Sequence, residues 1–154
     1  MRWHIDLKGW RLYIGISHSV KVKGVNSNLP DGRHILMWDF DNVEGEDVIN
    51  QLLYVQDRFK LSRIFLLNTG LDGHWHAYCF KAKSWANLLH ILASTEGLDQ
   101  TFFKIGIIRG FFTLRYSKKE GRGFIPAIIL PSRVQEDIDP FEDLVGCEFW
   151  TKRL

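Results

Sequence analysis

The sequence predicts an α+β fold, in which a split βαβ core (RRM-like or ferredoxin-like) of order β-α-β-β-α-β carries additional antiparallel strands at both ends. Short apolar runs bounded by turn residues indicate strands, and two segments place apolar residues at helical spacing. The 154 residues are 45% hydrophobic, with no repeat or linker, which is enough to bury one core. We therefore expect one domain over 1–154, with its core at about 34–130, N-terminal strands in 1–33 and a C-terminal extension over 131–154.

Two strands are expected before the core. Residues 10–17 alternate polar and apolar side chains, as a half-buried strand does, and residues 1–7 form a weaker strand. Gly, Asn, Pro and Asp are frequent between residues 24 and 32, which predicts a loop there.

The first half of the core is expected to run strand, helix, strand, strand. Residues 34–40 form a nearly continuous apolar run, typical of a central strand that is buried on both faces. Residues 47–59 have apolar side chains at helical spacing, with acids at the start and bases at the end. Residues 63–68 and 75–80 are predicted strands, separated by a turn at 70–73.

A second helix and further strands complete the prediction. Residues 84–93 have helical spacing, with Ser84 as the N-cap and Gly97 as the stop. Strands are predicted at 102–108, 111–116 and 124–130, joined by turns at 109–110 and 120–123.

Acidic residues and histidines stand at strand ends that this topology brings together. The first and third strands of a split βαβ core are antiparallel neighbours, so the end of one meets the start of the other. Asp39 and Asp41 end the first core strand, while His74 and His76 open the third. Paired carboxylates bind Mg²⁺ or Mn²⁺ and leave room for water and substrate phosphates. The sequence therefore predicts a metal site at this edge, with a histidine close enough to contact a phosphate.

Positive charge is concentrated later in the chain, although the formal net charge is only +2. Acidic residues dominate around 39–47 and 136–143. The basic cluster consists of Arg109, Arg115, Lys118, Lys119 and Arg122. Such a cluster could neutralise a triphosphate or a template backbone, or it could be a solvated hairpin turn.

These motifs resemble those of the archaeo-eukaryotic primase (primase-polymerase) superfamily, over roughly residues 34–130. The family's first motif, a hydrophobic strand ending in Asp-x-Asp, is similar to residues 36–41. Its second motif, a Gly-rich turn before a histidine-headed strand, resembles residues 68–76, and His76 matches the family histidine better than His74. An Asp-containing segment, an arginine-ending strand and a Lys/Gly-rich turn resemble residues 98–99, 111–115 and 118–122.

The resemblance implies a metal-dependent nucleotidyltransferase of DNA replication that makes or extends primers on single-stranded DNA or RNA, in a cell or a mobile element. Asp39 and Asp41 would hold Mg²⁺ or Mn²⁺, and His76 would contact the phosphates of the incoming nucleoside triphosphate. The phosphate- or template-binding residues implied are Arg115, Lys118, Lys119 and Arg122. Residues 137–154 either pack on the sheet or bind a partner such as a helicase.

One departure from the family pattern affects the predicted metal site. Where the third metal-binding acid is expected, this chain reads Ile107-Ile108-Arg109. Either Asp99 compensates, or the site is weakened and the chain is a nucleic-acid-binding module without catalysis. The family's usual zinc-binding insertion is absent, because Cys79 and Cys147 are too far apart to form it.

A rival hypothesis starts from the same histidines. His-x-His before an apolar strand is also the metal-binding signature of rolling-circle replication initiators and relaxases, DNA-nicking enzymes with a tyrosine nucleophile. In those enzymes a lysine follows the tyrosine by three residues, as Lys119 follows Tyr116. Against this, their tyrosine lies on a helix, whereas residues 111–116 predict a strand, and their first motif lacks Asp-x-Asp.

Simpler structural interpretations remain open for each motif. Asp-x-Asp could be a solvated turn in which Asp41 or Asn42 caps the next helix. His74 could be a turn histidine without a partner. Finally, the chain shows no secretory signal, no CxxC pair and no apolar stretch that could span a bilayer, which predicts a cytoplasmic protein without a membrane role.

Overall fold

The computed structural model describes the backbone of residues 2–7, 10–15, 19–117, 127–139 and 146–152, and the side chains of 23–117 and 128–139. This part of the chain is α+β, with three helices and antiparallel sheets. In chain order the elements are β1 (Arg2–Leu7), β2 (Trp10–Gly15), β3 (Ser19–Asn26), β4 (His34–Asp41), α1 (Gly45–Arg58), β5 (Ile64–Asn68), β6 (His74–Lys83), α2 (Trp85–Ala93), α3 (Gln100–Arg109), β7 (Thr113–Arg115), β8 (Ala127–Leu130) and β9 (Gly146–Lys152).

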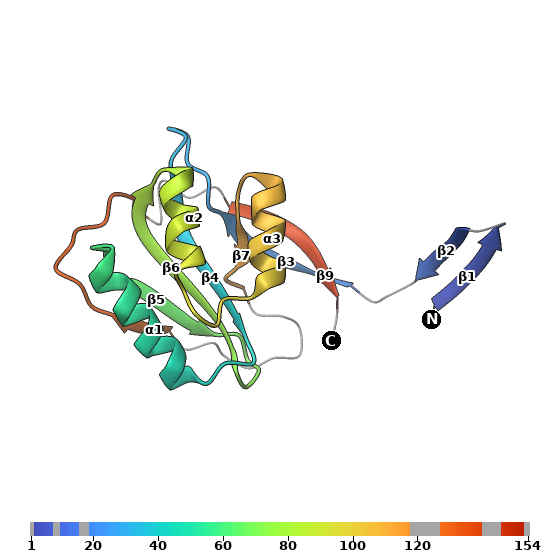
Figure 1. Ribbon diagram of the computed structural model, residues 1–154, viewed down its shortest axis with the longest axis horizontal. Coiled ribbons are helices and arrows are strands. Elements are labelled where there is room, and N and C mark those ends of the chain that lie inside the picture. The colour runs from blue at the N-terminus through green and yellow to red at the C-terminus, as the bar shows by residue number, and fades with distance from the viewer. Residues whose placement is uncertain (1, 8–9, 16–18, 118–126, 140–145, 153–154) are drawn as a thin grey trace.

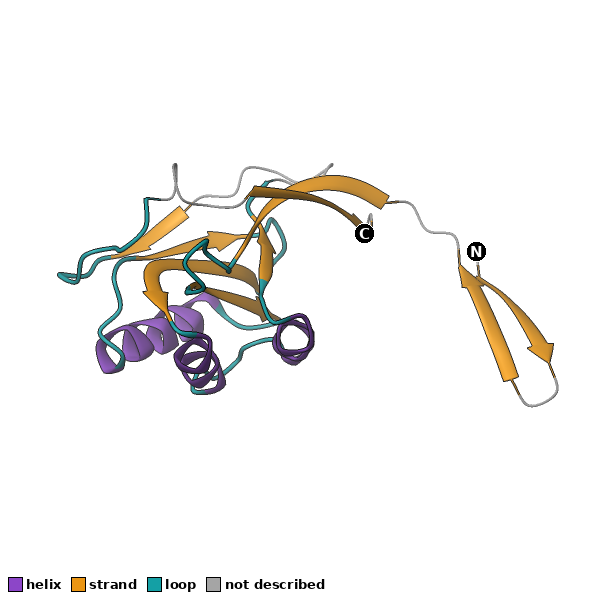
Figure 2. Ribbon diagram, turned by 90° about the horizontal axis from the view of Figure 1, so that it is seen from above, coloured by secondary structure: helices purple, strands orange, loops and turns teal. Residues whose placement is uncertain are grey.

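The main sheet has the strand order β4-β6-β5-β8, and every neighbouring pair is antiparallel. The three helices lie on one side of the strands (Figure 2). As predicted, the first and third strands of the core, β4 and β6, are antiparallel neighbours. This pairing sets the register of the acidic and histidine side chains described below.

Strand β4 is the most deeply buried strand among those whose side chains the structure describes. The side chains of residues 35–38 have no exposed surface, because α2 packs against β4 and the hydrophobic core surrounds it. The prediction that this strand is buried on both faces is therefore confirmed. Its predicted central position is wrong, because β4 is the end strand of its sheet.

Helix α1 confirms the helix predicted over 47–59, and Val48, Leu52 and Val55 are its fully buried apolar side chains. Its N-cap is Glu44, without a side-chain capping bond. The alternative in which Asp41 or Asn42 caps this helix is therefore wrong, which removes the simplest structural explanation of the Asp-x-Asp motif.

The segment predicted as a strand at 102–108 is instead helix α3, so the predicted order β-α-β-β-α-β is not observed. Asp99 is the N-cap, and its carboxylate accepts a hydrogen bond from the Phe102 amide. Gly110 ends the helix in the left-handed conformation, with φ of 78°. Short apolar runs fit a strand or a buried helix equally well, so the two capping residues decide this case.

The remaining strands form two further sheets. Strand β3 was not predicted; it extends into the expected loop at 24–32 and lies between β7 and β9 in a three-stranded sheet. Strand β7 is shorter than the predicted strand at 111–116. Strands β1 and β2 confirm the two early strands and form a hairpin that projects away from the rest of the chain (Figures 1 and 2). The turn predicted at 120–123 lies outside the described residues.

No helix in the described ranges is both long and apolar enough to cross a bilayer.

Candidate active site

The pairing of β4 with β6 brings the predicted acids and histidines together. Asp39 lies opposite His76, and Asp41 lies opposite His74. Because alternate residues of a strand point to the same face, all four side chains lie on one face of this strand pair. The convergence predicted from the topology is therefore present in the structure.

Asp41 and His74 form the outer pair. Asp41 Oδ1 lies 2.6 Å from His74 Nδ1, and the Asp41 side chain is 44% exposed. The interpretation of His74 as a turn histidine without a partner is wrong, because the antiparallel register places it directly beside this carboxylate.

His76 is buried and held by a neighbouring strand. Its Nδ1 lies 2.9 Å from the carbonyl oxygen of Arg115 at the end of β7. The Tyr78 hydroxyl donates to the same oxygen at 2.6 Å. Burial of the His76 ring lowers its pKa to about 4, so the imidazole is neutral at physiological pH. Its second nitrogen, Nε2, lies 3.4 Å from Asp39 Oδ1.

Asp39 is the inner carboxylate, and its pKa is unusually high for an aspartate. Burial, followed by the negative charges of Asp41 and Asp99, raises the pKa of Asp39 to about 7, although the Arg115 guanidinium acts in the opposite direction. Ionised Asp39 therefore lies where negative charge is poorly compensated. A divalent cation would relieve this repulsion, and the donor set fits one for that reason.

Asp99 reaches the same site from the loop before α3. Its backbone amide donates to the carbonyl oxygen of Asp39 at 2.8 Å, and Leu98 forms an isolated β-bridge with Phe40. Asp99 therefore lies beside Asp39 and brings a third carboxylate to this edge of the sheet. Its carboxylate also caps α3, so one oxygen already accepts a hydrogen bond.

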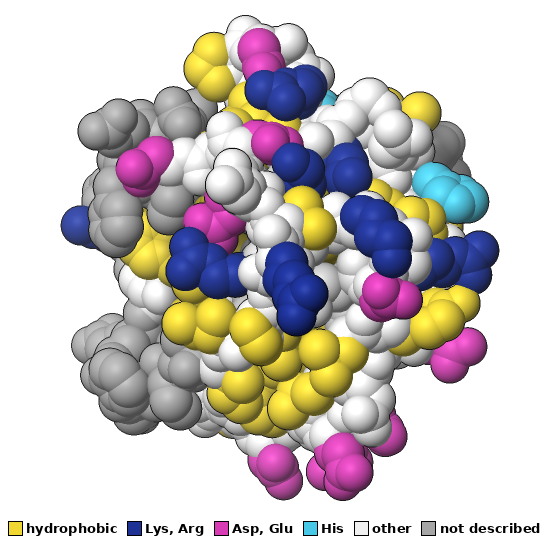
Figure 3. All heavy atoms as spheres, turned by 90° about the vertical axis from the view of Figure 1, so that its left-hand side faces the viewer, with side chains coloured by type: hydrophobic (Ala, Val, Ile, Leu, Met, Phe, Trp, Pro, Cys, Tyr) yellow, Lys and Arg dark blue, Asp and Glu magenta, His cyan; other side chains and the backbone are white. Residues whose placement is uncertain are grey.

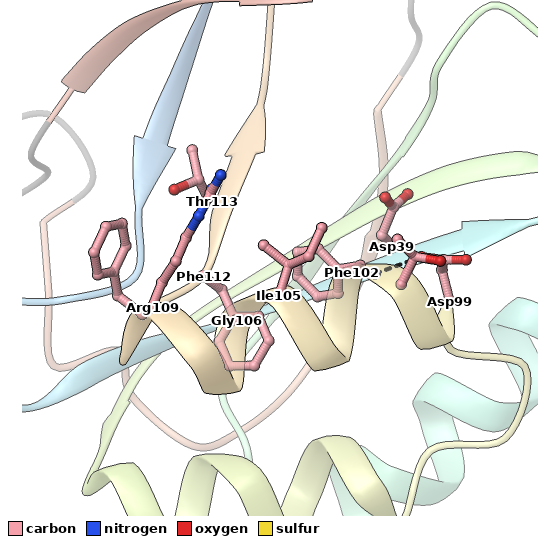
Figure 4. Close-up of a pocket in the computed structure, with 10 residues that line it drawn as sticks. Asp39, Asp99, Phe102, Ile105, Gly106, Arg109, Phe112 and Thr113 are labelled. Atoms are coloured by element: carbon pink, nitrogen blue, oxygen red, sulfur yellow. Dashed lines mark hydrogen bonds between the residues drawn. The ribbon is translucent and has the colours of Figure 1, made fainter. Parts of the chain in front are cut away.

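A pocket of about 270 Å³ runs along α3 from these acids (Figure 4). Asp39 and Asp99 line one end, whereas Arg109 and Thr113 line the other. The pocket wall between the two ends is mainly apolar and contains Phe102, Ile105, Phe111 and Phe112. The pocket thus joins an acidic end to a basic end across an aromatic surface, a combination that suits a ligand with both charged and ring-shaped parts.

The predicted basic residues are divided by the structure. Arg109 lines the pocket and forms no salt bridge with any described side chain. Arg115 is close enough for its charge to act on Asp39, and its Nη1 donates to the Ser117 carbonyl at 3.0 Å. Tyr116 directly follows β7 and is half exposed. The predicted residues Lys118, Lys119 and Arg122 lie outside the described residues.

A separate band of Lys and Arg side chains crosses the face shown in Figure 3, above a group of hydrophobic side chains. Several exposed basic residues of the described chain are ion-paired, namely Arg63 with Glu136, Lys81 with Asp137 and Lys60 with Asp57. Part of the positive charge outside the pocket is therefore locally balanced.

The possible metal ligands are few. Within the described ranges, no three His, Cys, Asp or Glu side chains form a group that could hold a metal ion. Asp39 with Asp41, and Asp39 with His76, can supply two protein ligands. Such a site would be completed by water and substrate phosphates, which is the usual arrangement for Mg²⁺ in phosphoryl-transfer sites.

The pocket wall was not predicted from the sequence as part of the site. Phe102 and Phe111 lie in the segments 102–108 and 111–116, which the sequence predicts as two strands, whereas the first of these segments is part of helix α3. The signal that could have identified the pocket was Asp99 as an N-cap, followed by Gly110 as a C′ residue.

Comparisons with known proteins add no information about this site. No protein-family model, curated protein or solved structure matches the chain. The function is therefore inferred from the positions of the described side chains.

Proposed function

We propose that this chain is a metal-dependent nucleotidyltransferase of the primase-polymerase type, which synthesises or extends primers on single-stranded nucleic acid in the cytoplasm. The observation that carries the proposal is the register in which Asp39 and Asp41 face His76 and His74, with Asp39 at the end of a pocket. A short Asp-x-Asp motif alone would not carry it, but the same motif at a pocket, beside a third carboxylate, does.

We also propose a topological relation to the split βαβ core. Elements β4, α1, β5, β6 and α2 correspond to its first five elements, and the adjacency β4-β6-β5 supports this. In this relation α3 occupies the place of the last strand and contributes the pocket wall.

Asp39 and Asp41 are the residues that would hold Mg²⁺ or Mn²⁺, with Asp99 as the third acid. The ion would neutralise the triphosphate and favour ionisation of the attacking hydroxyl. The protein's own contribution is position: the backbone bonds of β4 and of Asp99 fix the carboxylates before substrate binds.

The pocket along α3 is the proposed nucleotide-binding site. Its aromatic wall provides flat apolar surface on which a base can stack. Arg109, at the far end from the carboxylates, is free to bind a phosphate of the nucleotide or of the template strand. Arg115 is the arginine close to the acids, and its charge already acts on Asp39.

The test is one denaturing gel with the full chain. Single-stranded DNA, with and without an annealed labelled primer, is incubated with nucleoside triphosphates and Mg²⁺ or Mn²⁺. We expect longer products with the wild-type protein and none with the double variant Asp39→Ala/Asp41→Ala. The matched control is Asp57→Ala, because Asp57 is an exposed acid of α1 that pairs with Lys60 and does not line the pocket.

The outcomes separate the hypotheses. Products that persist in the double variant would falsify the proposal, provided that its circular dichroism spectrum shows the protein folded. Unchanged DNA with every protein would favour the nucleic-acid-binding module. Binding by such a module should weaken steeply with salt and should not respond to divalent metal.

One observation favours the DNA-nicking enzyme as a second candidate. His76 bonds to the Arg115 carbonyl, so Tyr116 is the residue next to the one that His76 contacts. The ring of Tyr116 is half exposed and therefore accessible to a strand of DNA. This candidate predicts shortened DNA and a covalent protein–DNA adduct, both lost in Tyr116→Phe, whereas the primase-polymerase proposal predicts that Tyr116→Phe keeps primer extension.

A further inference from the structure

The Nε2 atom of His76 faces the Oδ1 atom of Asp39, and both atoms can act as hydrogen-bond acceptors. A carbonyl oxygen can only accept, so the bond to Arg115 requires that His76 Nδ1 carry the proton. In the neutral ring, Nε2 then has a free lone pair. The Nε2 atom lies 3.4 Å from Asp39 Oδ1, which is also an acceptor when Asp39 is ionised.

Two facing acceptors need a proton or a cation between them. The separation of 3.4 Å is longer than ordinary hydrogen bonds of this kind, which span about 2.7–3.2 Å. Two adjacent ligands at about 2.1 Å from one ion lie roughly 3.0–3.4 Å apart. The observed distance therefore fits a shared metal ion better than a shared proton.

We propose that His76 Nε2 is a ligand of the catalytic metal ion together with Asp39 Oδ1, so that the site selects Mn²⁺ over Mg²⁺. This inference rests on the proposed function and changes the role of His76, which the family resemblance would assign to the nucleotide phosphates. An imidazole nitrogen suits a first-row transition metal better than Mg²⁺, which prefers oxygen ligands.

The surroundings of His76 are those of a supported ligand. A metal-binding histidine usually donates its other ring N–H to a carbonyl or carboxylate, which fixes its tautomer and orientation. The Arg115 carbonyl takes this role, and the Tyr78 hydroxyl bonds to the same oxygen. Burial of His76 holds the ring in place, since only 10% of its side chain is exposed. His74 differs in two ways: its Nδ1 contacts Asp41, a carboxylate that the proposed site itself uses for the metal, and its side chain is more exposed, at 26%.

The direct test is spectroscopic and uses the full chain with Mn²⁺ as the probe. Binding is followed by electron paramagnetic resonance, and pulsed measurements then detect histidine nitrogen bound to Mn²⁺. We expect a ¹⁴N coupling that changes to that of ¹⁵N when the wild-type protein is made with ¹⁵N-histidine. This experiment needs no variant and therefore does not depend on how a substitution folds.

Two matched variants identify the histidine that gives the nitrogen coupling. His76→Gln should lose it and bind Mn²⁺ at least about tenfold more weakly. His74→Gln should keep it, although His74 is the neighbouring histidine on the same face. In competition, a roughly tenfold or larger excess of Mg²⁺ should be needed to displace Mn²⁺ from the wild-type protein.

The outcomes distinguish failure of this inference from failure of the proposed function. Mn²⁺ that binds through Asp39, shown by its loss in Asp39→Asn, but has no histidine coupling overturns this inference and leaves the proposed function standing. A histidine coupling that is lost in His74→Gln but kept in His76→Gln also overturns it, because the ligand is then the neighbouring histidine. Absence of Mn²⁺ binding overturns both the inference and the metal-dependent function.

Discussion

The backbone amide of Asp99 donates a hydrogen bond to the carbonyl oxygen of Asp39 at 2.8 Å. This contact fixes the start of α3 to the end of β4. It also brings two carboxylates close together, and the charge of Asp99 contributes, after burial and Asp41, to raising the pKa of Asp39 to about 7. The acid pair and the acidic end of the pocket therefore have a common structural origin.

Asp99 has two roles that substitution can separate. Asn caps a helix about as well as Asp, so Asp99→Asn should keep stability, whereas Asp99→Ala should lose about 1 kcal/mol. Both should reduce primer extension if the charge of Asp99 serves the metal site. Urea denaturation and the extension assay measure the two effects. Full activity in Asp99→Asn would limit Asp99 to capping α3.

The raised pKa of Asp39 predicts an unusual dependence of stability on pH. Between about pH 4 and pH 7 the unfolded chain ionises this carboxyl while the native protein keeps the proton. Native stability without metal should therefore fall as pH rises through this range. Asp39→Asn removes the effect, so the variant should be more stable than wild type by about 4 kcal/mol above pH 7 and equal to it near pH 4. Melting curves in EDTA test this, and parallel pH profiles would contradict it.

Arg109 should contribute to nucleotide binding. A charge-assisted hydrogen bond is worth about 1.5–3 kcal/mol, so Arg109→Ala should raise the KM for the nucleoside triphosphate about tenfold or more. Arg109→Lys should restore part of the loss, because the charge remains. The control is Lys104→Ala, since Lys104 is on α3 but does not line the pocket. An equal effect of both alanine variants would indicate loss of general surface charge.

Gly106 should be required for packing of α3. A Cβ atom there would lie 2.0 Å from the ring of Phe112, which is almost fully buried. The strain, about 3 kcal/mol, exceeds the roughly 1 kcal/mol that alanine adds to helix propensity, so Gly106→Ala should destabilise the protein by about 2 kcal/mol. Phe112→Leu in the same chain should recover part of this loss, because the smaller side chain frees space. Chemical denaturation of the wild type and the two variants provides the comparison.

The fold was predictable where one type of periodicity was unambiguous. Val48, Leu52 and Val55 fall on one face of a helix and are all fully buried, as predicted. The segment from Phe102 to Ile108 has no such face, since Ile107 and Ile108 are exposed and Gly106 is the only buried residue of α3. Its caps, which are local polar contacts, determined the helix. Strand β3 was missed because its partners, β7 and β9, are distant in sequence.

The candidate site was predictable only in its first layer. Asp39, Asp41, His74 and His76 follow from the antiparallel pairing of two strands that could be identified in the sequence. The contact of His76 with the Arg115 carbonyl could not be predicted, because a backbone acceptor has no residue-specific signal. The pocket depended on α3, so the error at 102–108 concealed it.

The carbonyl oxygen of Arg115 joins two sheets, because β7 pairs with β3 while His76 and Tyr78 belong to β6. If β7 moved away, His76 would lose the acceptor that fixes its tautomer, and its ring could turn over and exchange Nδ1 for Nε2. The orientation of the His76 imidazole therefore depends on whether the two sheets are packed together. Packing of the sheets and correct placement of His76 in the site both require this one hydrogen-bond acceptor.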